Sequence, residues 1–137
     1  MLFRSDYAKK NGLKPMAKIV AQASHAQAPE WFTTAPVGSI QKLLKKANLK
    51  ASDIDLYEIN EAFSVVALAC IKELSLDPKK VNIHGGAVAL GHPIGASGAR
   101  ILTTLVHSLK TQGKRYGVAS LCIGGGEASA LLVEACH

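Results

Sequence analysis

The segment 61–74 is the feature that most constrains how this chain can fold, because it is apolar on almost every side. Its length and spacing predict a helix, and a helix of this kind must be covered on more than one side. The whole chain has 137 residues, which is one domain's worth of polypeptide with a core of its own. We therefore expect a layered fold in which a second half of the same protein covers this helix.

Two kinds of hydrophobic pattern flank that helix and predict a sheet with further helices. Alternating or β-branched runs predict strands at 18–25, 53–59, 81–83, 116–123 and 128–133. Apolar residues at helical spacing predict helices from Ile40 to Ala47 and from Ile101 to Leu109, the second ending before Gly113. This order predicts an α/β fold, a three-layer βαβαβαββ arrangement with helices packed on a mixed five-stranded sheet. The last two strands are expected to form an antiparallel hairpin.

The net charge of +6 and the pI of about 9.3 raise the question of nucleic-acid binding. The lysines are scattered in ones and twos, without an arginine-rich run or interleaved aromatic residues, so the pattern favours solvated helix faces. We expect no nucleic-acid partner, and the alternative use of this charge is to steer an anionic substrate.

The sequence predicts neither a membrane span nor a secretory signal. The apolar run 62–71 is too short to cross a bilayer, and the N-terminus lacks the apolar core of a signal peptide. Three cysteines without metal-ligand spacing fit a reducing compartment. We therefore expect no membrane partner and a cytoplasmic location, with mitochondria as the alternative.

Glycines gather in two segments, 85–98 and 124–126, and each segment adjoins a predicted strand. Glycine allows tight turns and a close approach of backbone N–H groups to a ligand, so the two loops predict the floor of a pocket. Residues 91–98 match neither the phosphate-binding lysine motif nor the dinucleotide-binding glycine motif. A zinc site from His84, His92 and Cys122 matches no common ligand spacing, and we expect no metal.

His92 and Cys122 are the two residues of these loops whose side chains can perform acid–base chemistry. His92 is held on stiff backbone between a glycine and a proline, and Cys122 ends an apolar strand directly before the second glycine segment. From the residues alone, core packing for the cysteine and a structural role for the histidine stay open. Asn60 and Ser97 precede apolar helices, so each is expected to be a helix N-cap.

Three motifs resemble the C-terminal motifs of the thiolase family and stand in the same order. They are Asn-Glu-Ala-Phe at 60–63, the glycine-rich block at 85–98 that contains His92, and Cys-Ile-Gly-Gly-Gly at 122–126. Ketoacyl synthases, which are related condensing enzymes, typically have a second histidine where this chain has Cys122, so the last motif favours a thiolase. The resemblance implies that residues 15–137 form a thiolase C-terminal domain and that 1–14 are an N-terminal remnant, helical or loose.

The same resemblance implies a role for five residues. His92 would activate a nucleophilic cysteine and help to hold the thioester oxygen, and Asn60 would fix a water that supplies the other hydrogen bond to that oxygen. Cys122 would be the general acid and base, the backbone N–H of Gly124 would belong to a second oxyanion hole, and Phe63 would line the pantetheine channel.

The resemblance also implies the reaction, which is the reversible condensation of two acetyl-CoA to acetoacetyl-CoA and CoA. The thioesters are substrates, and no cofactor is expected. A longer-chain 3-ketoacyl-CoA thiolase and a non-catalytic module that binds acyl-CoA or a partner stay open.

One departure from the family pattern concerns the nucleophile. The family's nucleophilic cysteine belongs to an N-terminal half that these residues do not include, and Cys70 and Cys136 lack its sequence context. The chain is therefore expected to need an N-terminal thiolase half as its partner, to be inactive alone, and to form a homo-oligomer, dimer or tetramer, when complete. His84 is a second departure, because the family often has Asn there.

Overall fold

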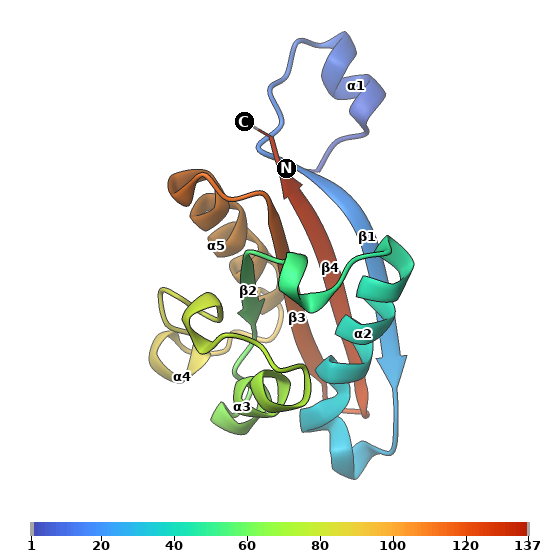
Figure 1. Cartoon of the computed structure of the whole chain (residues 1–137), viewed down its shortest axis with the longest axis vertical. Coiled ribbons are helices and arrows are strands. Elements are labelled where there is room, and N and C mark those ends of the chain that lie inside the picture. The colour runs from blue at the N-terminus through green and yellow to red at the C-terminus, as the bar shows by residue number, and fades with distance from the viewer. Residues whose placement is uncertain (1, 137) are drawn as a thin grey trace.

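The computed structural model describes residues 2–136, and its centre is one four-stranded sheet. The strands are β1 (Ala17–Ala26), β2 (Leu56–Ile59), β3 (Tyr116–Ile123) and β4 (Glu127–Ala135), in the spatial order β1-β4-β3-β2 (Figure 1). β4 runs antiparallel to both β1 and β3, whereas β2 runs parallel to β3. The sheet is therefore mixed, and the predicted antiparallel hairpin of the last two strands is confirmed.

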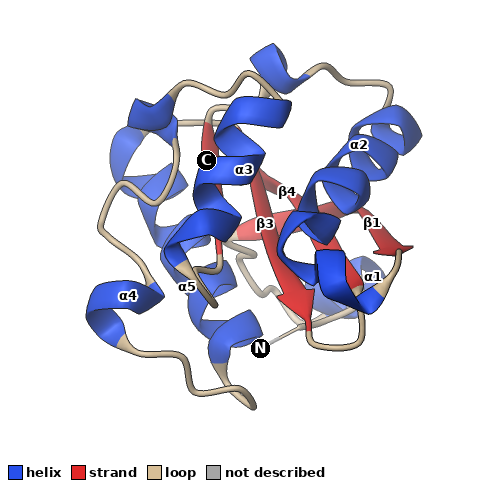
Figure 2. Ribbon diagram, turned by 90° about the horizontal axis from the view of Figure 1, so that it is seen from below, coloured by secondary structure: helices blue, strands red, loops and turns tan. Residues whose placement is uncertain are grey.

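Helices cover both faces of this sheet, as the predicted three layers require. α2 (Ala35–Ala47) and α3 (Ser64–Glu73) pack on one face and α5 (Ser97–Gln112) on the other, and β3 lies between α2 and α5 in Figure 2. Val118 and Leu132 share a core cluster with α2 and α3, whereas Ala119 and Val133 share one with α5. The shorter elements are α1 (Ser5–Lys10), α4 (Ala87–Leu90) and the 3₁₀ turns η1 (Pro29–Thr34), η2 (Ala51–Asp53) and η3 (Pro78–Lys80).

The prediction of a fifth strand at 81–83 is wrong. Val81 makes one isolated parallel bridge to Tyr57, and the chain then turns at Asn82, whose φ is +47°. The side chain of Asn82 takes the place of a further strand pair. Its Nδ2 donates to the carbonyl of Ile59 at 2.9 Å, and its Oδ1 accepts from the N–H of Ile59 at 2.8 Å. The left-handed conformation of Asn82 ends the extended chain after Val81. The backbone N–H and carbonyl of Ile59 are therefore paired by the side-chain amide of Asn82 and not by a fifth strand.

Both predicted N-caps are also wrong. The N-cap residue of α3 is Phe63, so Asn60 lies before the helix rather than at its cap. α5 begins at Ser97 itself, and its N-cap residue Ala96 makes no side-chain hydrogen bond. Asn and Ser favour caps because their short polar side chains bond to nearby backbone. Here both side chains contact His92 instead.

α3 is buried on one side only within the described chain. Val66, Ala67 and Cys70 pack into the core, whereas Val65 and Leu68 are 49% and 62% exposed. An apolar helix with an open side fits the expectation that a further part of the protein covers it.

The N-terminal residues add one short element to the fold. α1 lies before the boundary predicted at residue 15, and that boundary stays a prediction. Over residues 2–136, no helix combines the length and the apolar character that a membrane crossing needs.

Candidate active site

Three of the predicted site residues lie at one edge of the sheet. Asn60 directly follows β2, Cys122 is near the end of β3, and Gly124 follows β3. The two strands are parallel, so their carboxyl ends meet at the same edge. A hydrogen bond of 2.9 Å from the N–H of Asn60 to the carbonyl of Ser120 extends their pairing by one residue. In open α/β sheets this edge is where ligands bind.

Asn60 and His92 are in contact across 32 residues of sequence. Asn60 is fully buried, and its Nδ2 lies 3.4 Å from Nε2 of the exposed His92. The Oδ1 of Asn60 is also buried, and no described residue donates a hydrogen bond to it. Buried polar atoms are nearly always paired, so this oxygen is free to accept a hydrogen bond from a water or a further group.

Ser97 contacts Nδ1 of His92 and favours one tautomer of its imidazole. Its hydroxyl donates to the carbonyl of Pro93 at 3.1 Å, and its Oγ lies 2.6 Å from Nδ1 of His92. When the hydroxyl donates to Pro93, Nδ1 of the neutral imidazole donates to Ser97. Nε2 then has the lone pair and faces Nδ2 of Asn60, an amide nitrogen that can donate to it. In this tautomer Nε2 is the basic nitrogen of His92 at the sheet edge.

Cys122 is a buried thiol held in its neutral form. Burial raises the pKa of the Cys122 thiol above its ordinary value, and a hydrogen bond from its own backbone N–H offsets a smaller part of that effect. Cys70 lies in the same core cluster, where burial and then the nearby Cys122 raise its thiol pKa to about 12. Cys70 is a core residue, whereas Cys122 stands at the edge where Asn60 lies.

Gly124 and Phe63 are exposed near the same edge. Gly124 lies in the turn between β3 and β4, and a Cβ added there would meet nothing within 4 Å. Phe63 precedes α3 and makes an edge-on contact with Phe32, the two ring centres being 6.0 Å apart. The described residues hold no group of three or more His, Cys, Asp or Glu that could bind a metal ion.

The three cysteines should differ in their rates of alkylation. The thiolate is the reactive form, so a buried thiol with a raised pKa reacts slowly at neutral pH. We expect iodoacetamide to modify exposed Cys136 first, Cys122 later and Cys70 last, as followed by timed mass spectrometry of the folded chain. The alkylation rate of Cys122 should still rise with pH where that of a free thiol has levelled off, because the Cys122 thiol ionises at higher pH. Modification of Cys122 as fast as that of Cys136 at pH 7 would contradict this order.

Comparison with known proteins identifies the family of this fold and site. The family model described as the C-terminal domain of thiolase matches residues 13–135. The chain therefore belongs to the thiolase family, in its C-terminal domain. Within that family it is similar to acetyl-CoA acetyltransferases. Acetyl-CoA acetyltransferase 1 of Arabidopsis thaliana is 58% identical to it over 134 residues, and the mitochondrial acetyl-CoA acetyltransferase of Bos taurus is 56% identical.

These matches cover nearly all of this chain but only part of the relatives. They include 98% of the chain, against 32% of the Arabidopsis protein and 31% of the bovine one. The chain thus spans about a third of the length of the curated relatives it matches.

Solved structures agree with the predicted thiolase-like α/β fold. The acetyl-CoA acetyltransferase of Bacillus anthracis matches with a TM-score of 0.94 at 47% identity, over 96% of this chain and 34% of that one. Acat5 thiolase of Ascaris suum, solved in complex with coenzyme A, matches with a TM-score of 0.92 at 52% identity, over 97% and 34%. The prediction of the family and of its α/β fold is confirmed, apart from the fifth strand.

Sequence reasoning missed the polar residues that surround the predicted ones. Ser97 was expected to cap a helix, yet it orients His92. Glu58 and Arg100, which form an ion pair between buried β2 and α5 with Arg100 half-buried, were not singled out at all. Glu58 is one polar residue among several in the predicted alternating strand 53–59, so its residue type alone gives no signal that its carboxylate is buried and needs a partner.

Proposed function

We propose that this chain is the C-terminal part of an acetyl-CoA C-acetyltransferase. The complete enzyme would condense two acetyl-CoA to acetoacetyl-CoA and CoA, and would run the cleavage in reverse. The observation that carries the proposal is the contact between Asn60 and His92 at the strand edge that also bears Cys122. A base, a buried amide and a thiol at one edge are the groups that acyl transfer between thioesters requires.

His92 and Asn60 would serve the nucleophile, which we place in an N-terminal half. In cleavage, Nε2 of His92 takes the proton of the nucleophilic thiol, and the thiolate attacks the ketone carbon of acetoacetyl-CoA. The imidazole then carries a proton on Nε2 and donates a hydrogen bond to the thioester oxygen of the departing acetyl-CoA, which becomes an enolate oxygen as the carbon–carbon bond breaks. The unpaired Oδ1 of Asn60 supports the second contact, since it can hold a water that donates to the same oxygen.

Cys122 would supply the proton of the carbon–carbon step. When the bond between C2 and C3 of acetoacetyl-CoA breaks, its electron pair stays on C2 of the departing acetyl-CoA, and the Cys122 thiol protonates that carbon. The raised pKa of Cys122 supports this role, because the thiol is neutral at the start of cleavage. The resulting thiolate takes the proton of incoming CoA, whose sulfur then receives the acetyl group from the nucleophile. The backbone N–H of Gly124 would stabilise the oxyanion of that second step, and Phe63 would line the channel for the pantetheine arm.

Cofactor need, substrates, partner and compartment follow from this function. Each step moves protons and acyl groups between thiols and carbons, so its balance requires no cofactor. We propose acetyl-CoA and acetoacetyl-CoA as substrates, an N-terminal thiolase half as the partner that covers the open side of α3, and a homo-oligomer as the complete form. Two relatives of similar sequence, one bovine and one from Mus musculus, are named as mitochondrial, so the compartment is proposed as cytoplasm or mitochondria.

Reconstitution with a nucleophile half tests this function. The chain is co-expressed with, or fused to, the N-terminal two thirds of the Arabidopsis relative, and cleavage of acetoacetyl-CoA by CoA is measured. We expect turnover from the reconstituted enzyme, none from the chain alone, and none from a control whose N-terminal half carries Ala in place of its nucleophilic cysteine. Turnover by the chain alone that is lost in Cys122→Ala, or an assembled hybrid without turnover, would overturn the proposal.

The same hybrid separates a second candidate. The human mitochondrial 3-ketoacyl-CoA thiolase matches this chain with a TM-score of 0.94 at 44% identity. This match favours a thiolase that acts on longer 3-ketoacyl chains as the second candidate. Comparing kcat/KM for acetoacetyl-CoA with that for longer 3-ketoacyl-CoA thioesters decides between the two. A preference for the C4 substrate supports the acetyltransferase.

A further inference from the structure

The segment 86–96, which carries His92, is held in place by few buried apolar side chains. Ala87 is buried, whereas Val88 is 68% exposed, Leu90 63% and Ile94 85%. Apolar contacts that stabilise other parts of the fold are therefore scarce here. Polar contacts at the two ends of the segment must fix the position of His92, and both ends reach carboxylates in or beside β2.

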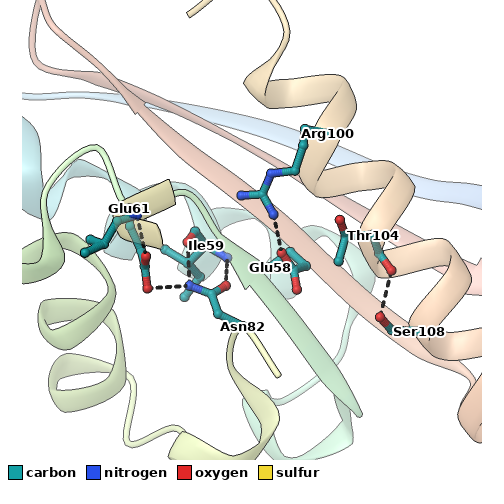
Figure 3. A network of polar contacts seen from close by, with 8 residues as sticks. Glu58, Ile59, Glu61, Asn82, Arg100, Thr104 and Ser108 are labelled. Carbon is teal, nitrogen blue, oxygen red and sulfur yellow. Dashed lines mark hydrogen bonds and ion pairs between the residues drawn. The ribbon is translucent and has the colours of Figure 1, made fainter. Parts of the chain in front are cut away.

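Glu61 holds the first end of the segment. Its Oε2 accepts from the backbone N–H of Val88 at 3.0 Å, and its Oε1 accepts from Nδ2 of Asn82 at 3.3 Å (Figure 3). Asn82 is itself fixed to Ile59 by its two side-chain hydrogen bonds. The fit is close, because a Cβ added to Gly86 would lie 2.5 Å from the Glu61 carboxyl group. The start of the His92 segment is thus tied to the end of β2.

Glu58 holds the second end. It is 2% exposed, and its Oε2 accepts from Nη1 of Arg100 at 3.2 Å; Figure 3 shows the guanidinium reaching from α5 toward this carboxylate. Arg100 is three residues after Ser97, which lies one turn earlier on the same helix and orients His92. Glu58 and Asn60 are two apart on an extended chain, so their side chains point to the same face. The ion pair therefore ties the helix that orients His92 to the strand that carries its contact, Asn60.

The buried carboxylate of Glu58 and its half-buried partner Arg100 are costly to desolvate, which argues for a purpose beyond stability. Burial raises the pKa of Glu58 to about 7, although Arg100 acts in the opposite direction. Nη2 of Arg100 is buried and donates a hydrogen bond to no described acceptor. Apolar residues of similar volume at such a place often give equal or greater stability. Glu61 also faces Glu58 closely enough to raise its pKa slightly, so the two carboxylates form one local group.

We infer that Glu58 and Glu61 are positioning residues for His92. Together they hold both ends of its segment, so that Nδ1 faces Ser97 and Nε2 faces Asn60. The significance of this for catalysis rests on the proposed function, whereas the positioning itself is a property of this chain. Loss of either carboxylate should shift the tautomer ratio of His92 while the sheet stays folded.

Nuclear magnetic resonance of the imidazole nitrogens tests this inference directly. The 137-residue chain is labelled with ¹⁵N-histidine, and its five histidines are resolved by long-range ¹H–¹⁵N spectra, with His92 assigned by its loss in His92→Gln. The expected signal of His92 at neutral pH is that of the Nδ1–H tautomer. In Glu58→Gln and in Glu61→Ala, the ratio of the Nδ1–H to the Nε2–H form should fall about fivefold or more, the effect of losing one net hydrogen bond.

A matched control removes an arginine–carboxylate pair elsewhere. Arg115 and Glu134 form an exposed pair, and Arg115 directly precedes β3, at the opposite end of that strand from Cys122. Glu134→Gln should leave the His92 signals unchanged. Far-UV circular dichroism and amide dispersion show which variants are folded. If a carboxylate variant does not fold, Arg100→Lys and Gly86→Ala perturb the same two contacts from the other side.

Two results would overturn the inference. One is a folded Glu58 or Glu61 variant that keeps the wild-type tautomer ratio of His92, and the other is an equal change of that ratio in Glu134→Gln. Because the spectra need no nucleophile half, an inactive hybrid would overturn the proposed function without affecting this result. In an active hybrid, Glu58→Gln should lower kcat more than it raises KM, since a displaced base impairs the chemical step.

Discussion

In a hybrid with a thiolase N-terminal half, Cys122→Ala is expected to lower kcat for acetoacetyl-CoA cleavage by about 10²–10⁴-fold. The reason is that the carbanion leaving the broken carbon–carbon bond loses the thiol that protonates it. Exchange of the methyl protons of acetyl-CoA with D₂O uses the same thiol in the opposite direction, so it should fall in parallel. Both rates are measured on the same preparation.

Two controls separate this effect from general damage. Cys136→Ala removes an exposed thiol one residue from the end of the chain and should leave both rates unchanged. Cys122→Ser exchanges only the sulfur for a smaller oxygen and should lose most of the activity, because a hydroxyl is a far weaker acid than a thiol. A Cys122→Ala hybrid with wild-type kcat would exclude this residue as the proton donor.

The hydrophobic patterns predicted the sheet where strands pack on both faces. β3 and β4 have apolar residues on both sides, such as Val118 toward α2 and Ala119 toward α5, and their ranges agree with the prediction within a few residues. The apolar run before Leu74 correctly predicted a helix with one side left to be covered. Patterns of this kind succeed because burial alone decides them.

The same patterns failed where a single polar side chain decides the local structure. Asn82 ends the predicted fifth strand by taking a left-handed conformation and pairing its amide with Ile59. Asn60 and Ser97 belong to residue types that favour caps, and sequence alone could not show that a histidine distant from Asn60 would engage both. Local preference describes what a residue can do, whereas tertiary contacts select among the options.

The candidate site was predicted from motifs rather than from physics. From chemistry and spacing alone, Cys122 could be a core residue and His92 a structural one. The thiolase-like motifs supplied their expected catalytic roles. The strand pairing explains in part why the residues belong together, since parallel β2 and β3 bring Asn60 and Cys122 to one edge. Glu58 could not be found in this way, because its burial depends on the register that places it opposite Ala119 and beneath Arg100.

Gly126→Ala is expected to destabilise the fold strongly. Gly126 has a φ of +96°, and an added Cβ would overlap the backbone carbonyl oxygen of Gln27 and lie 3.1 Å from Cα of Pro29. Gln27 also donates its N–H to the carbonyl of Gly126 at 3.0 Å, so neither segment can move away without losing this bond. Backbone strain and overpacking together should lower the free energy of unfolding by about 3–5 kcal/mol. Urea unfolding of the chain, followed by circular dichroism, measures the change.

Gly124→Ala provides the matched control, because it lies in the same turn with open space around it. Its free energy of unfolding should stay within about 1 kcal/mol of wild type, since an alanine there meets no neighbour and its backbone is not left-handed. If both variants lower the free energy of unfolding equally, the cause is the loss of a glycine from the turn and not the contact with Gln27. If Gly126→Ala costs no more than about 1 kcal/mol, the turn can relax, and a rigid link between β1 and the residues after Cys122 is excluded. The predicted contrast therefore tests whether the glycine turn is a fixed platform for the N–H of Gly124 or a mobile connection.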